Sequence, residues 1–205
     1  MAKPKRRKKK KPLLSSNALI GIFIVLLMVG SGVGLMLGRN PPNQGGGVYN
    51  DYTFERGNSG WSTQYEGSTL EFRYLPDMIE NLEVSGDALS TLQNTPGFYL
   101  TYDPNDKNIQ SIEVARLQLE RTFSQKLEKY MGVGVVKSSP NYEGFPIITC
   151  ENASQNVPVV YFKTSNSTGF EYEKNCLHVN FQTGSEVFML KDRLMYGITG
   201  IIENG

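Results

Sequence analysis

The sequence predicts an α+β protein with a single N-terminal transmembrane helix, followed by one extracytoplasmic domain that has a mixed β-sheet and two main helices. A basic run precedes an uncharged segment, and both cysteines lie beyond that segment. Strand-like and helix-like apolar periods alternate in the rest of the chain. The predicted parts are a basic cytoplasmic tail at 1–12, a transmembrane signal anchor at 13–38, a Pro/Gly-rich tether at 39–48 and an extracytoplasmic domain at 49–205.

The uncharged segment has the length and composition of a membrane span. No Asp, Glu, Lys, Arg or His occurs from Pro12 to Gly38, and about 20 mainly apolar residues cross a hydrocarbon core roughly 30 Å thick. Residues 2–11 before it contain eight Lys and Arg, and such a tail stays in the cytoplasm. The sequence therefore predicts a single-pass protein of the cell membrane whose C-terminal domain is extracytoplasmic.

Cleavage of this segment is the alternative to an uncleaved signal anchor. A secretory signal has a shorter apolar region of about 7–15 residues, whereas this one continues to Gly38. Gly32 and Gly34 could nevertheless serve as a small-x-small cleavage site. A pilin leader is disfavoured, because the segment lacks a preceding small residue and an internal Glu. The uncleaved anchor is our prediction.

Three glycines at the end of the segment recur every four residues. Gly30, Gly34 and Gly38 would share one face of a helix, and small residues let helices approach closely in lipid. We expect this helix-packing face to bind a membrane-protein partner or a second copy of the chain. The alternative is that glycine is simply common in membrane helices.

Charge is divided unevenly between the two sides of the predicted membrane. Residues 39–205 contain 13 of the 21 Lys and Arg and all 20 Asp and Glu, so their formal charge is −7. An acidic domain disfavours polyanionic ligands. The basic tail suits anionic lipid head groups, and no aromatic residue precedes Phe23 to stack on a base. We therefore expect the lipid bilayer, and no nucleic acid, as a partner.

The first part of the domain predicts an antiparallel meander and a short helix. Apolar and polar residues alternate between Gly-containing turns, which is typical of paired strands. Ser85 is placed to cap the helix. The predicted elements are the strands Tyr52–Phe54, Trp61–Tyr65 and Thr69–Tyr74, the helix Gly86–Leu92 and the strand Phe98–Tyr102.

The middle of the domain predicts a β–α–β unit. Apolar residues from Ile112 to Tyr130 recur at helical spacing, which predicts a helix over Gln110–Met131. The strand Val133–Val136 follows it. Further strands are predicted at Phe145–Thr149 and Pro158–Phe162, and the second is apolar enough to be central in the sheet.

The end of the domain predicts a hairpin and a final helix. The strands Phe170–Tyr172 and Cys176–Phe181 flank a short turn. Thr183 and Glu186 have the spacing of a capping box, in which each side chain accepts from a backbone amide of the other end. The apolar residues that would then share one helix face are Val187, Leu190, Leu194, Ile198 and Ile201.

The two cysteines and the single histidine are the first candidates for chemistry. Cys150 and Cys176 predict one disulfide in an oxidising compartment, worth roughly 3–4 kcal/mol in the chain-entropy model. His178 would share a strand face with Cys176. A bridged cysteine is no nucleophile, and a structural zinc site usually has four ligands. We therefore expect neither a catalytic pair, nor a metal, nor a cofactor here.

Acidic segments offer two weaker candidates. Residues 103–108 begin like a calcium loop, but the ligand spacing fails at Lys107 and Val114 occupies the twelfth position, so a turn is the better interpretation. Asp77, Glu80 and Glu83 could serve a glycosidase if two of them faced each other across a cleft. Solvated surface charge is the alternative, and the sequence favours it.

Two glycosylation sequons begin at Asn152 and Asn166. Both asparagines fall in predicted loops on the extracytoplasmic side of the membrane. They can be modified if the host has the machinery.

Four segments together resemble uncharacterised single-pass membrane proteins from archaea. These are Trp61 in the early meander, Glu113–Arg116 at the start of the long helix, Pro146–Ala153 and Lys191–Gly197. The resemblance covers most of the domain. It implies no activity, so it assigns no functional residues.

The sequence favours a non-enzymatic binding or assembly module of the cell envelope. No nucleophile elbow, phosphate loop or dinucleotide fingerprint occurs. The alternative is a membrane-tethered envelope hydrolase that uses His178 or the acids between Asp77 and Glu83.

Overall fold

The computed structural model describes residue 20 and residues 46–202 of the chain. The latter belong to a compact unit, Gly45–Gly205. Apart from residue 20, the predicted signal anchor lies outside the described residues, as do the basic tail and most of the tether. Of the helices in the part that the structure describes, none combines the length and the hydropathy needed to cross a bilayer.

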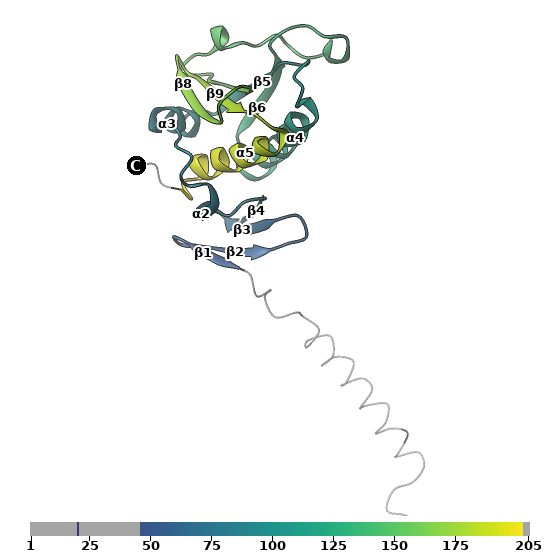
Figure 1. The fold of residues 1–205 in the computed structure, drawn as a ribbon. Coiled ribbons are helices and arrows are strands. Elements are labelled where there is room, and N and C mark those ends of the chain that lie inside the picture. The colour runs from purple at the N-terminus through teal and green to yellow at the C-terminus, as the bar shows by residue number, and fades with distance from the viewer. Residues whose placement is uncertain (1–19, 21–45, 203–205) are drawn as a thin grey trace, which may run out of the picture. The chain divides into compact units, whose positions relative to one another are not determined.

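The domain is α+β, as predicted, and its four helices are accompanied by two β-sheets (Figure 1). One sheet is antiparallel with the strand order β1-β2-β3-β4, and the other is mixed with the order β6-β5-β7-β9-β8. The strands are β1 Gly47–Tyr49, β2 Tyr52–Arg56, β3 Trp61–Tyr65, β4 Ser68–Phe72, β5 Gly97–Tyr102, β6 Tyr130–Val135, β7 Val159–Thr164, β8 Gly169–Glu173 and β9 Cys176–Phe181. The helices are α2 Pro76–Ile79, α3 Gly86–Asn94, α4 Ile109–Lys126 and α5 Gly184–Thr199.

The four-stranded sheet has one strand more than the predicted meander. The extra strand, β1, begins at Gly47 and pairs with β2 from Gly47↔Phe54 to Tyr49↔Tyr52. The connecting turn is tight because Asn50 adopts the left-handed conformation (φ 49°), which Asn tolerates better than most residues. The glycines that precede Val48 had predicted a flexible tether. The last of them, Gly47, instead pairs with β2 and belongs to the sheet.

The five-stranded sheet confirms the β–α–β unit and the hairpin. β5 runs parallel to both β6 and β7, and β7 is the central strand, as its apolar sequence predicted. β8 and β9 pair antiparallel across a two-residue turn. The turn residues Lys174 and Asn175 have φ values of 51° and 64°, as a type I′ turn requires at both positions.

Two predicted elements in the middle of the domain were wrong. α4 ends at Lys126 rather than Met131, because Glu128 is left-handed (φ 49°) and the chain turns into β6. Leu127 and Tyr130 extended the helical period only by coincidence. The predicted strand 145–149 is reduced to one bridge between Val135 and Ile147. Apart from this bridge, the segment belongs to the connection 136–158 between β6 and β7 and does not pair with the sheet.

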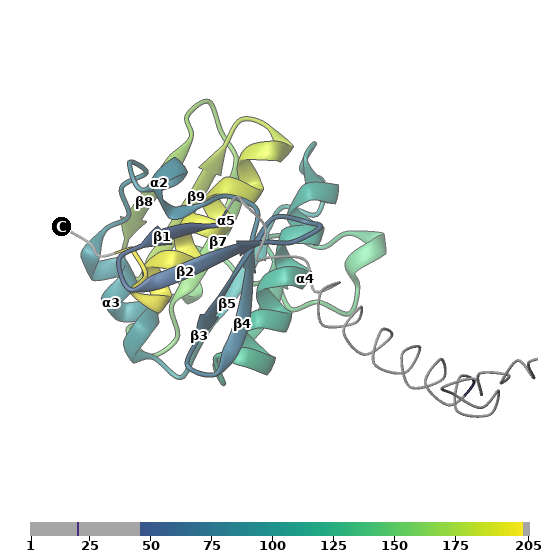
Figure 2. The same ribbon diagram turned by 90° about the horizontal axis from the view of Figure 1, so that it is seen from below.

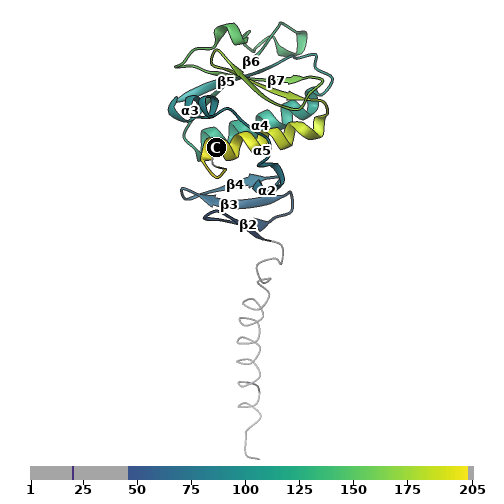
Figure 3. The ribbon, with the colours of Figure 1, turned by 60° about the vertical axis from the view of Figure 1, so that its left-hand side comes forward.

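Helix α5 lies beside α4 in the layer between the two sheets (Figure 3). Val187, Leu190 and Leu194 are fully buried, as the predicted face requires. The opposite stripe is buried as well: the Tyr196 ring stacks on Phe72 with centroids 4.0 Å apart. Seen from below, β1–β4 lie in front of α5 (Figure 2). The apolar face predicted from the sequence is therefore only one of two buried faces of this helix.

Both ends of α5 differ in detail from the prediction. The side chain of Thr183, the N-cap residue, makes no capping bond. The Glu186 carboxylate instead accepts from the backbone N–H of Gln182 at 2.9 Å and the Thr168 hydroxyl at 2.5 Å. At the other end Gly200 is left-handed (φ 71°) and terminates the helix. Ile201, expected on the helix, is buried just beyond it.

Candidate functional site

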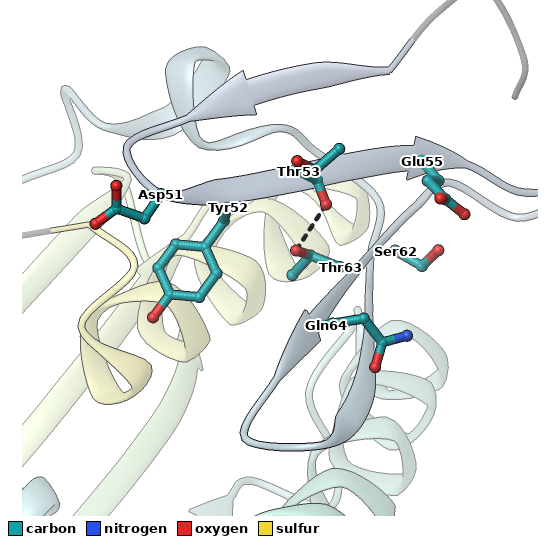
Figure 4. Close-up of a pocket in the computed structure, with 7 residues that line it drawn as sticks. All are labelled: Asp51, Tyr52, Thr53, Glu55, Ser62, Thr63 and Gln64. Carbon is teal, nitrogen blue, oxygen red and sulfur yellow. Dashed lines mark hydrogen bonds between the residues drawn. The ribbon is translucent and has the colours of Figure 1, made fainter.

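A hollow of about 280 Å³ lies on the four-stranded sheet, where β2 and β3 diverge (Figure 4). β2 pairs with β3 only at Glu55↔Ser62 and Arg56↔Trp61. Beyond these pairs the Thr63 hydroxyl donates to the Thr53 carbonyl at 2.8 Å, so one side-chain bond replaces the backbone ladder. The residues that line the hollow are Asp51, Tyr52, Thr53, Glu55, Ser62, Thr63 and Gln64.

The lining of the hollow is acidic and rich in hydrogen-bonding groups. Asp51 and Glu55 lie at its two ends, and Gln64 approaches from β3 (Figure 4). The Gln64 amide is oriented by a 2.8 Å bond to Thr69 Oγ1. The Tyr52 ring, stacked near Tyr65 with centroids 6.3 Å apart, adds an aromatic surface. These groups together can recognise a neutral ligand that carries several hydroxyls.

Sequence reasoning missed this hollow. Thr53, Glu55 and Gln64 occupy alternate, exposed strand positions, which any solvated meander would show. What creates the hollow is the early end of the β2–β3 pairing, and the sequence carries no pattern for that divergence. The only available signal was the concentration of Asp, Thr, Glu, Ser and Gln side chains on two neighbouring predicted strands.

The predicted disulfide between Cys150 and Cys176 is present, with an S–S distance of 2.03 Å. His178 Nε2 lies 3.5 Å from Cys150 Sγ. Within the described residues these three side chains form a group whose ligand atoms all lie within 4.8 Å of one another. Two of these three side chains are joined in the disulfide. The group therefore has no thiolate that could bind a metal.

The surroundings of His178 are polar, and the residue is half-buried. In the strand register Tyr161 and Glu171 flank it on either side, and its ring centroid is 5.7 Å from that of Tyr161. Burial, followed by the charge of Lys163, lowers the pKa of His178 below its usual 6.5. Its Nδ1 atom and the Oδ1 atom of Asn180 are buried without a hydrogen-bond partner.

The acids considered for a hydrolase do not converge. Asp77, Glu80 and Glu83 are all exposed, and none of them lines the hollow. Glu80 accepts a 2.7 Å hydrogen bond from the Tyr49 hydroxyl. Burial and this bond raise the pKa of Tyr49 to about 12. The segment therefore contributes surface charge and one contact to β1.

The segment that began like a calcium loop forms turns that brace the sheet. Asp103 Oδ1 accepts from the Asn105 amide at 2.8 Å. Both oxygens of Asp106 bind Thr164 at the end of β7, at 2.5 Å to its hydroxyl and 2.9 Å to its amide. These carboxylates are thus engaged with the protein itself.

The remaining predicted residues fall into two groups. Asn152 and Asn166 of the sequons are exposed, and Asn152 Oδ1 accepts from the Thr149 amide at 2.8 Å. The predicted helix-packing face, Gly30, Gly34 and Gly38, lies outside the described residues.

Comparisons of the chain with protein-family models, curated proteins and solved structures find no match.

Proposed function

We propose that this chain is a single-pass, membrane-anchored, non-enzymatic binding module of the cell envelope. Its ligand site would be the hollow between β2 and β3, and its ligand a neutral, hydroxyl-rich glycan. The observation that carries the proposal is the lining: carboxylates, hydroxyls and an amide surround an open hollow beside the Tyr52 ring. Small-ligand sites combine a concave surface with a few convergent polar groups.

The charge of the hollow selects among ligands. Asp51 and Glu55 contribute two carboxylates, and no Lys or Arg lines the hollow. Residues 39–205 carry a formal charge of −7 in total. Anionic sugars and phosphates would be repelled, whereas ring hydroxyls can donate hydrogen bonds to carboxylates. A neutral glycan carries hydroxyl donors and no negative charge, so it suits this hollow.

The spacing of the two carboxylates favours binding over cleavage. Asp51 lies in the turn before β2 and Glu55 four residues later in that strand, and four residues of extended strand span about 13 Å. Glycosidases hold their two carboxyl groups roughly 5–9.5 Å apart across the scissile bond. Asp51 and Glu55 lie at opposite ends of the hollow (Figure 4). This geometry supports the binding module over the membrane-tethered hydrolase, which stays the second candidate.

The length of the tether supports a site close to the membrane. The predicted anchor ends at Gly38 and β1 begins at Gly47. The eight residues between them can span at most about 30 Å when fully extended. With such a tether the domain would meet glycans attached to, or layered on, the outer membrane surface.

Titration calorimetry of the full-length protein in nanodiscs tests the proposal. We expect mannotriose or chitotriose to bind and polygalacturonate not to bind. The double variant Asp51→Asn/Glu55→Gln should lose at least tenfold in affinity. Glu83→Gln, which neutralises an exposed acid outside the hollow, should retain it. Failure of both neutral sugars to bind, or equal affinity of the double variant, would contradict the proposal. Release of shortened sugars would favour the hydrolase.

The glycine face is a separate proposal about partners. If Gly30, Gly34 and Gly38 pack against another helix, replacing Gly30 and Gly34 with Leu should abolish crosslinking of the full-length protein in cells. Crosslinks that persist in the variant would contradict that role and leave the glycan site unaffected.

A further inference from the structure

The two cysteines of the disulfide differ in burial. Cys176 begins β9, between β7 and β8, and its side chain is fully buried. Cys150 is partly exposed and lies in a single 3-10 turn of the connection 136–158. The Thr149 side chain caps that turn and accepts from the Glu151 amide. An incoming thiol can therefore reach Cys150 and is kept away from Cys176.

The accessible sulfur has an imidazole beside it. His178 Nε2 is 3.5 Å from Cys150 Sγ, while Nδ1 is buried without a partner. Buried side-chain nitrogens usually have a hydrogen-bond partner. Among the described residues, the contact to this sulfur is therefore the only side-chain hydrogen bond that His178 makes. Because burial and Lys163 lower its pKa, the imidazole is neutral near pH 7 and can accept a proton.

We propose that Cys150–Cys176 is a thiol–disulfide exchange centre whose substrate is a dithiol of a protein or peptide. Cys150 is the sulfur that is attacked, Cys176 is the leaving group and His178 is the proton acceptor. This activity goes beyond the proposed glycan binding and does not depend on it, because the centre lies on the five-stranded sheet and the hollow on the other sheet.

The exchange balances without any further reagent for a single turnover. One substrate thiol gives its proton to His178 Nε2, and its sulfur bonds to Cys150 Sγ. The S–S bond breaks, and its electron pair leaves on Cys176 Sγ, which takes the proton from His178. All three atoms lie within 4.8 Å of one another. The second substrate thiol then attacks the substrate sulfur bound to Cys150. The substrate leaves as a disulfide, oxidised by two electrons, and Cys150 leaves as a thiolate and takes the second proton.

The placement of the two cysteines in the fold suits opening and closing of the bridge. Cys176 is fixed at the start of β9, where it pairs with β7 and β8, whereas Cys150 belongs to a connection that packs on that sheet. Other contacts also hold the connection: the Thr101 hydroxyl donates to the Ile148 carbonyl at 2.7 Å, and Val135 exchanges backbone hydrogen bonds with Pro146 and Ile148. Opening the bridge therefore frees the Cys150 side chain and leaves the strand pairing intact.

Mapping with glutathione tests which sulfur reacts. Full-length Cys176→Ser and Cys150→Ser proteins are treated with oxidised glutathione, and mass spectrometry follows the mixed disulfide over time. We expect Cys150 in the first variant to react at least tenfold faster than Cys176 in the second, with circular dichroism showing that both variants are folded. Equal rates in the folded proteins, or faster reaction at Cys176, would overturn the proposal.

The role of the histidine is tested by the rate at which dithiothreitol reduces the disulfide. We expect His178→Asn to slow reduction at least tenfold, because general bases contribute about 10²–10⁴-fold. Tyr161→Phe, which preserves the neighbouring ring, should stay within twofold of the unaltered protein. A loosened fold would speed reduction, so slower reduction cannot come from structural damage. An unchanged or faster rate in His178→Asn would overturn the assignment.

Discussion

The two sheets of the domain pack against the same helix, yet they differ in what covers their other face. The five-stranded sheet lies between α5 on one side and the connection 136–158 on the other (Figures 1 and 3). Polar groups on its outer face, such as Asn180, are buried. The corresponding positions of the four-stranded sheet, such as Thr53 and Gln64, are exposed. The outer face of the five-stranded sheet is thus partly covered, and that of the four-stranded sheet is open.

The contacts to α5 differ as well. The five-stranded sheet packs on it with apolar side chains, including Leu177 and Val179. The four-stranded sheet is held by the Asp192 carboxylate, which accepts from the amides of Arg73 and Tyr74 at 2.7 and 3.0 Å. Lys191 Nζ is 2.5 Å from the same fully buried carboxylate. Both sheets thus pack on α5 with apolar side chains, since Phe54 and Phe72 of the small sheet contact Tyr196. The small sheet adds a group of polar contacts at Asp192.

The largest effect is expected from Asp192→Ala. Lys191 would be left as an uncompensated buried charge, and two amides would lose their acceptor. Breaking such a pair costs roughly 4 kcal/mol of the free energy of unfolding, which urea denaturation followed by circular dichroism would measure. Asp87→Ala, at an exposed site on α3, is the control and should change little. A loss below about 1 kcal/mol would mean that Asp192 does not hold the small sheet.

Leu177→Ala tests the apolar side of the comparison. Its side chain is 1% exposed, so truncation leaves a cavity and should cost roughly 3 kcal/mol in the same assay. Leu117→Ala on α4, where the side chain is 54% exposed, is the matched control. If both variants lost the same small amount, the large sheet could not be the main source of stability.

Tyr196→Phe separates the ring of Tyr196 from its hydroxyl. The stack on Phe72 remains, but the 2.8 Å hydrogen bond to the Tyr74 carbonyl is lost. We expect destabilisation by about 1 kcal/mol, the usual net value of one hydrogen bond. Urea denaturation of this variant beside Asp192→Ala ranks the two contacts. A greater loss in Tyr196→Phe would reverse the assignment of Asp192 as the principal polar contact.

The smallest effect concerns pH. The Thr168 hydroxyl and the Gln182 amide lower the pKa of Glu186 below its ordinary 4.5. The ionised Glu186 carboxylate therefore stabilises the folded state fully above pH 4.5. This contribution is lost as the pH falls from 4.5 through the pKa that Glu186 has in the folded protein. Glu186→Gln should lower the thermal midpoint at pH 7 and reduce its fall between pH 6 and 3. Glu143→Gln, at an exposed site, should reproduce the unaltered profile, and identical profiles for both variants would contradict this role.

Local patterns predicted those parts of the fold that local physics determines. The β8–β9 hairpin follows from its turn residues, and α5 from its apolar period. The second buried stripe of α5 was not predictable, because the packing of a distant sheet decides whether Asp192 is solvated or enclosed. The hollow and the approach of His178 to Cys150 depend on strand divergence and on the path of a long connection. Neither leaves a periodic signal in the sequence.

Hydrogen–deuterium exchange of the full-length protein, with and without mannotriose, tests most directly the claim that the open sheet is the binding face. We predict slower exchange on ligand addition in residues 51–64 and no change in residues 159–181. Protection of the five-stranded sheet instead, or of neither sheet at a saturating sugar concentration, would contradict the claim.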